Sequence, residues 1–310
     1  MNAQTKMAIV AIVVVIPLTS VVVYGTNTNQ EFASNDNSKL QAISSFNPLH
    51  EFSQIVGGEK IDVTLLVPVG VEPHDWEPTI KDVQRMQKSD LIVINGIGFE
   101  SWVDDLIEND YQGIIVNTSN GIELNSSEEE HEEEGQEDDH GHLEGDPHIW
   151  LNPLYAKIQV QNIANAFANS DSTNSEFYLA NAEKYNKKLD SLDSKIRTNL
   201  TDCKRDFIAF HDAFSYFADE YDLNQHTIVA TTNSHGEVTA KTLENVISTA
   251  RELNIKVIFS EETVNAKTSQ IIANEIGGKV LVLSPLEIVS EDNYISKMTQ
   301  NLENLKEALC

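Results

Sequence analysis

Cysteine is scarce in the 310-residue chain, which contains only Cys203 and Cys310. Cysteine-rich zinc modules and iron–sulfur clusters need about four thiolates, so the sequence excludes both kinds of site. Whether the two residues form a disulfide bond is left open at this point, because pairing depends on how close the fold brings them.

Basic residues are also few: 21 Lys and Arg face 49 Asp and Glu, which gives a formal net charge of −28. A surface of this sign repels nucleic-acid phosphates and attracts cations. We therefore expect no nucleic-acid partner.

Eleven of the acidic residues lie between Glu128 and Asp146, a stretch that contains no Lys or Arg. Its scarcity of apolar side chains predicts a loop at residues 125–145 rather than a packed element. Three interpretations stay open: a solvated loop, a weak metal-binding segment and a sensor of metal abundance. The candidate weak chelators are His131, His140 and His142.

Long apolar runs are absent except for Met7–Tyr24, which has 18 uncharged residues. This length lies between a signal-peptide core and a membrane-spanning helix of about 20 residues. Either interpretation exports the rest of the chain, and a buried core helix is the alternative. We favour an uncleaved anchor and tether over residues 1–39, and we expect an extracytoplasmic protein at the cell surface.

The remaining sequence alternates short apolar runs with amphipathic stretches, which predicts an α/β fold with parallel sheets. In a first lobe, residues 40–172, the expected strands are Val63–Val69, Leu91–Ile94 and Gly113–Val116, and the expected helices are Ile80–Ser89, Trp102–Ile107 and Pro153–Phe167. In a second lobe, residues 203–310, the expected strands are Phe207–Phe210, His226–Ala230, Lys256–Ser260 and Lys279–Leu283, and the helices are Asp212–Glu220, Ala240–Leu253, Ala266–Ile276 and Asn293–Ala308.

A long helix is predicted between the lobes, within residues 173–202. Its apolar positions recur every three or four residues from Tyr178 to Leu200, without Pro or Gly. About 26 helical residues span roughly 40 Å, enough to connect two lobes. The expected fold is therefore two lobes, each with a mainly parallel four-stranded sheet flanked by helices, joined by one long rigid helix.

Three histidines occupy places where ligands gather in such folds. His211 directly follows an expected strand, and His74 and His148 lie in loops stiffened by neighbouring prolines. Imidazole is a common metal ligand, and three imidazoles with one oxygen suit tetrahedral Zn²⁺, whereas Mn²⁺ prefers carboxylates. Glu261 and Ser284 also follow expected strands directly.

The segments around these histidines resemble those of a known family. PHDWEPT resembles the Pro-His-x-x-Glu-Pro signature of the zinc and manganese solute-binding proteins of ABC importers (cluster A-I, high-affinity zinc receptor type). DPHIWLNP resembles their Asp-Pro-His-x-Trp-Leu-x-Pro signature, and HDAFSYFA resembles their third-ligand segment. The acidic–histidine run resembles the charged loop of the zinc-type members.

The resemblance implies a ligand set of His74, His148 and His211. The third position is Glu in manganese-type members, so His211 favours Zn²⁺. The family often has Asp as a fourth ligand where this chain has Ser284, which leaves water, Glu261 or Ser284 for that position.

Asp146 is a candidate hydrogen-bond partner for His148 or a neighbouring imidazole, and a turn or cap residue is the alternative.

The resemblance further implies a non-enzymatic, monomeric receptor that captures Zn²⁺ and delivers it to the permease of an ABC importer. Two other functions stay open. Three histidines around zinc also occur in hydrolases, which leave one position for water. A surface adhesin of the same fold would use the metal as a structural element.

Overall fold

The computed structural model describes residues 39–124, 145–229, 231, 238–262 and 264–310. Its first sheet has the strand order β2-β1-β3-β4, with β1 at Leu40–Ser44, β2 at Ile61–Leu65, β3 at Leu91–Ile94 and β4 at Ile114–Asn117. All neighbouring pairs are parallel, so the carboxyl ends of these strands share one edge.

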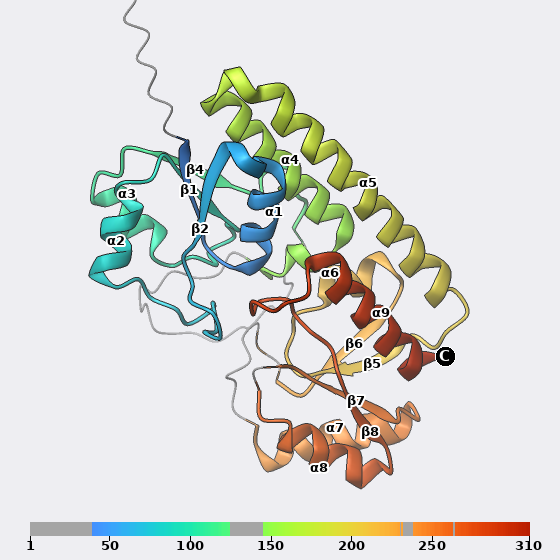
Figure 1. Cartoon of the computed structure of the whole chain (residues 1–310). Helices are drawn as coiled ribbons and strands as arrows, with labels where there is room; N and C mark the ends of the chain where they lie inside the picture. Colours follow the sequence, from blue (N-terminus) through green and yellow to red (C-terminus); the bar gives the residue numbers. More distant parts are fainter. Residues whose placement is uncertain (1–38, 125–144, 230, 232–237, 263) are drawn as a thin grey trace, which may run out of the picture. The chain divides into compact units, whose positions relative to one another are not determined.

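Helices cover both faces of this sheet (Figure 1). Apolar residues of the central strand β3 alternate between the two faces. Leu91 and Val93 join one core cluster with Phe46 and Leu49, and Ile92 and Ile94 join another with Trp102. The flanking helices are α1 at Asn47–Gly57, α2 at Ile80–Met86 and α3 at Val103–Glu108, with a short 3₁₀ turn at Gly58–Lys60.

Two elements of this lobe escaped the sequence analysis. β1 has only three apolar residues, and α1 follows it almost directly. The strand ends in the buried Ser44, whose small side chain allows close packing of the helix: Ser44 Oγ lies 3.0 Å from Ser53 Oγ of α1. The expected strand Val63–Val69 is also displaced: β2 ends at Leu65, although Leu66 and Val67 still donate backbone hydrogen bonds to Ser44 and Ser45.

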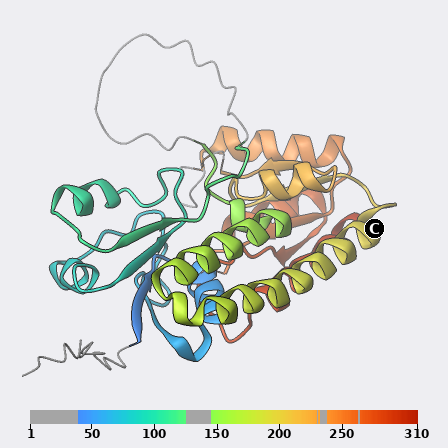
Figure 2. The same cartoon turned by 90° about the horizontal axis from the view of Figure 1, so that it is seen from above.

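The predicted long helix is confirmed as α5, which covers Ser175–Leu200. Every residue of the apolar stripe is buried: Tyr178, Ala182, Tyr185, Leu189, Leu192, Ile196 and Leu200. α5 packs on α1 and on α4 (Pro153–Ser170) of the first lobe and on α9 (Tyr294–Leu309) of the second (Figures 1 and 2). It therefore connects the two sheets as expected.

The second sheet repeats the topology of the first, with the order β6-β5-β7-β8 and only parallel pairs. Its strands are β5 at Asp206–Ala209, β6 at Asn224–Thr227, β7 at Val257–Ser260 and β8 at Lys279–Val282. The helices beside them are α6 at Ser215–Glu220, α7 at Ala240–Glu252 and α8 at Lys267–Ile276. The expected strand His226–Ala230 begins two residues earlier, at Asn224, and α6 begins three residues later than predicted.

The expected fold class is thus confirmed. The boundaries of the two lobes, at residues 40–172 and 203–310, stay a prediction, and residues 39–310 form one compact unit. Within the described residues, no helix combines the length and apolarity needed to cross a membrane. The apolar run Met7–Tyr24 and the segment with His131, His140 and His142 lie outside those residues.

Cys203 and Cys310 form a disulfide bond, which answers the question left open by the sequence. It joins the turn after α5 to the end of α9 and closes a loop with a sequence separation of 107 residues. Closing a long loop restricts the unfolded chain, so the bond stabilises the second lobe.

We predict that the double variant Cys203→Ser, Cys310→Ser loses about 2–4 kcal/mol of unfolding free energy. Chemical denaturation followed by circular dichroism measures this loss. Reduced wild-type protein is the matched control and should unfold like the variant. Equal stability of the oxidised wild type and the variant would contradict the prediction.

Candidate metal centre

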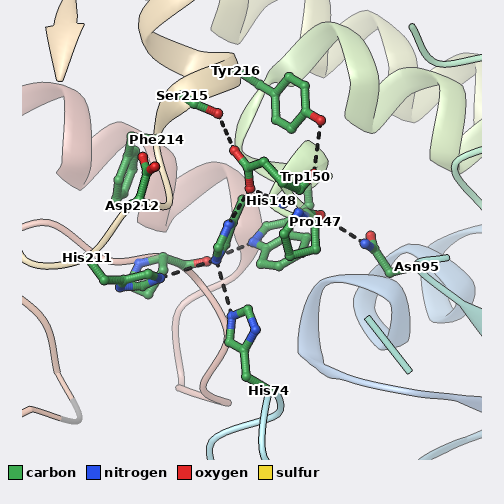
Figure 3. A network of polar contacts seen from close by, with 12 residues as sticks. His74, Asn95, Pro147, His148, Trp150, His211, Asp212, Phe214, Ser215 and Tyr216 are labelled. Carbon is green, nitrogen blue, oxygen red and sulfur yellow. Dashed lines mark hydrogen bonds and ion pairs between the residues drawn. The ribbon is translucent and has the colours of Figure 1, made fainter. Parts of the chain in front are cut away.

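The structure brings the three predicted histidines together between the carboxyl ends of the two sheets. His74 comes from the loop between β2 and α2, His148 precedes the 3₁₀ turn Ile149–Leu151, and His211 follows β5. Their rings point toward one another (Figure 3). His148 Nε2 lies 3.2 Å from both His74 Nε2 and His211 Nε2.

Glu287 completes the cluster, and the sequence analysis missed it. Its Oε1 lies 3.2 Å from His74 Nε2 and 3.3 Å from His148 Nε2. Together with His211, these residues form a group whose potential ligand atoms all lie within 4.8 Å of one another. His148, His211 and Glu287 are buried, and the His74 side chain is only 5% exposed.

These spacings fit a tetrahedral ion. Zinc bonds to nitrogen or carboxylate oxygen of about 2.0–2.1 Å give a tetrahedron with edges of about 3.3–3.4 Å. Four of the six separations among Nε2 of the three histidines and Oε1 of Glu287 are 3.2–3.3 Å. The side chains therefore stand close to the positions that one such ion requires.

Asp146 orients His148, in agreement with one interpretation of the sequence. Its Oδ1 lies 2.6 Å from His148 Nδ1 and accepts a hydrogen bond from the His148 backbone N–H over 3.0 Å. The hydroxyl of Ser215 donates to Asp146 Oδ2, and Tyr216 donates to the Asp146 carbonyl over 2.9 Å (Figure 3). Because Nδ1 is occupied, Nε2 of His148 faces the centre.

Glu261 orients His211 in the way that Asp146 orients His148. Its Oε1 lies 2.6 Å from His211 Nδ1, so Nε2 of His211 is the nitrogen directed to the other histidines. Its Oε2 is buried and has no hydrogen-bond partner within the described residues. Glu261 therefore contacts the outer nitrogen of His211 and is not among the clustered potential ligand atoms.

Ser284 is also outside the cluster. Its backbone N–H donates to Asn301 Oδ1 over 2.8 Å, and its hydroxyl oxygen accepts from the Leu286 N–H over 3.2 Å. The chain then turns through Leu286, which has a left-handed φ of 64°, and delivers Glu287 to the histidines. Glu287 therefore places its oxygen beside the inward-facing Nε2 atoms, whereas Asp146 and Glu261 contact the Nδ1 atoms on the other side of their rings.

Buried carboxylates dominate the electrostatics of the cluster. Burial alone would lower the pKa of His148, but Asp146 and Glu287 outweigh it and raise this pKa to about 10. Burial would raise the pKa of Glu287, but His148 and His74 hold it below its ordinary value. The pKa of His74 is lowered, mainly by burial. The protein thus holds anionic oxygen against imidazoles, an environment that stabilises a cation.

Aromatic side chains exclude water from one side of the centre. The ring of Phe99 meets His74 edge-on with a centroid distance of 4.8 Å, and Trp150 lies 5.0 Å from His148. Trp76, the other tryptophan near the histidine loops, packs against Trp102 instead.

The family described as zinc-uptake complex component A, periplasmic (ZnuA), matches residues 43–308. The chain belongs to this family. The high-affinity zinc uptake system protein ZnuA of Bacillus subtilis is 39% identical over 295 residues, which cover 92% of each chain.

Solved structures agree with this membership. Zn(II)-bound AdcA of Streptococcus pneumoniae has a TM-score of 0.75 and 30% identity, over 87% of this chain and 58% of that one, so the match spans little more than half of AdcA. The laminin-binding protein Lmb of Streptococcus agalactiae, described as bifunctional with adhesin and metal-transporting activity, has a TM-score of 0.79 and 27% identity, over 87% of this chain and 99% of that one.

We predict that Zn²⁺ binding releases about one proton at neutral pH. The raised pKa keeps His148 protonated in the metal-free protein, whereas a metal needs its neutral Nε2. Affinity should therefore rise by about tenfold per pH unit up to about pH 10, where His148 loses its proton without metal, and fall on acidification. Titration calorimetry in two buffers of different ionisation enthalpy counts the protons. Equal observed heats in the two buffers would refute the prediction.

Proposed function

We propose that this protein is an extracytoplasmic receptor that binds Zn²⁺ through His74, His148, His211 and Glu287 and delivers it to an ABC-type importer. The observation that carries the proposal is the meeting of four buried ligand atoms from both lobes at near-tetrahedral spacing. Membership of the ZnuA family supports the transport role.

The donor set favours Zn²⁺ over Mn²⁺. Three imidazole nitrogens and one carboxylate oxygen suit a tetrahedral borderline-soft ion, whereas Mn²⁺ prefers a larger set of oxygen ligands. Zinc-bound AdcA, a relative of the same fold, is consistent with this preference.

A receptor fits the site better than a hydrolase does. Catalytic zinc sites keep one position for water, and here Glu287 stands at the fourth position. Glu261, a buried carboxylate that a hydrolase could use as a general base, is engaged with His211 Nδ1. Zinc-dependent turnover of ester or peptide substrates by the purified protein would argue for the hydrolase instead.

Two observations bear on location. The Cys203–Cys310 disulfide is typical of oxidising compartments outside the cytosol, and the apolar run Met7–Tyr24 provides an export or anchor signal. We therefore propose that the receptor acts at the cell surface. Membership of the ZnuA family supports docking on an importer permease, and we expect a monomer.

Adhesion is a second candidate function, because Lmb combines it with metal transport on the same fold. The two functions separate in a binding assay with immobilised laminin. Zinc-dependent retention of the wild-type chain on laminin would favour an added adhesin role, and zinc binding without retention would favour the receptor alone.

We predict that His211→Ala weakens Zn²⁺ binding by more than about 100-fold, since loss of an outer partner alone costs about 10–100-fold. Competition with a chelator of known affinity measures the dissociation constant. His226→Ala is the matched control, because His226 lies on the neighbouring strand β6 and contacts Asp206 rather than the cluster. Full zinc affinity in His211→Ala would overturn the assignment.

A further inference from the structure

Glu287 lies on a turn whose beginning is hydrogen-bonded to the second lobe. The backbone N–H of Ser284 donates to Asn301 Oδ1 over 2.8 Å, and Asn301 Nδ2 donates to the Ser284 carbonyl over 2.7 Å. Asn301 belongs to α9. This pair of hydrogen bonds fixes the chain at Ser284, three residues before Glu287.

The next two carbonyls are held by side chains of the first lobe. Trp150 Nε1 donates to the Pro285 carbonyl over 2.7 Å, and Asn47 Nδ2 donates to the Leu286 carbonyl over 3.0 Å. These two hydrogen bonds connect residues 135 and 239 positions apart in the sequence. They also flank Leu286, whose left-handed backbone conformation is unfavourable for a bulky residue other than glycine.

Both donors are themselves fixed. Trp150 is fully buried and packs on His148 and Phe46. Its carbonyl also accepts a hydrogen bond from Tyr294 over 2.7 Å. Asn47 is the first residue of α1, a helix that buries Leu49, Phe52 and Val56 in the first lobe.

We propose that Asn47 and Trp150 are positioning residues that hold the Glu287 carboxylate against His74 and His148. The inference rests on the proposed role of Glu287 as a zinc ligand. The first lobe then supplies His74 and His148 and shares in holding Glu287, whereas the second lobe supplies His211, with Glu261 at its Nδ1.

The test compares Asn47→Ala with Asn304→Ala. Asn304 of α9 makes the same kind of hydrogen bond, from Nδ2 to the Val282 carbonyl over 2.7 Å, but within the second lobe. Zn²⁺ affinity is measured by chelator competition, and Co²⁺ bound in place of zinc reports the ligand set through its visible absorption. Glu287→Gln provides the reference for loss of the carboxylate.

We expect Asn47→Ala to weaken zinc binding by about 3- to 10-fold, the effect of losing one hydrogen bond. Its Co²⁺ spectrum should shift in the direction of Glu287→Gln, and Trp150→Phe, which removes the indole N–H, should shift it likewise. Asn304→Ala should keep the wild-type affinity and spectrum.

The outcomes separate this inference from the proposed function. If Glu287→Gln keeps wild-type affinity and spectrum, Glu287 is not a ligand and the proposed site is wrong. If Glu287→Gln changes both but Asn47→Ala and Trp150→Phe behave like Asn304→Ala, the site stands and the positioning role is overturned.

Discussion

The arrangement of the centre depends on one constraint: three imidazole nitrogens and a carboxylate oxygen must share a buried space in which all of them face inward. Nitrogen lone pairs directed at one another and at an anionic oxygen are unfavourable unless a cation or a proton lies between them. The protein holds the rings in this orientation because Asp146 and Glu261 contact the Nδ1 atoms of His148 and His211, on the side of each ring away from the centre. In the metal-free protein the proton on His148 meets this requirement, and a bound metal ion takes its place.

The fold explains why these groups can meet. Both sheets are parallel and have the same strand order, so each presents the carboxyl ends of its strands on one edge, where loops carry the polar residues. The buried stripe of α5 packs against helices of both lobes and so holds the two lobes together. Hydrogen bonds between the lobes, such as that from Trp150 to Pro285, then add local precision that the helix alone does not provide.

The sequence predicted the features that arise from regular patterns. The stripe of α5 follows from its spacing, and the three histidines stand out because they lie beside prolines or directly after a strand. β1 and α1 were missed because a short central strand with polar residues lacks an apolar run. Glu287 was missed because the search stopped at the strand end, Ser284. The turn through Leu286 moves the functional position three residues further, and the only sequence signal was an acidic residue directly after Ser-Pro-Leu.

The most direct test of the account is anomalous diffraction at the zinc edge from crystals of the zinc-loaded protein. The account predicts one strong peak between the lobes, about 2.0–2.2 Å from Nε2 of His74, His148 and His211 and from a carboxylate oxygen of Glu287. A zinc peak coordinated elsewhere, with these four side chains lacking a shared ion, would contradict it.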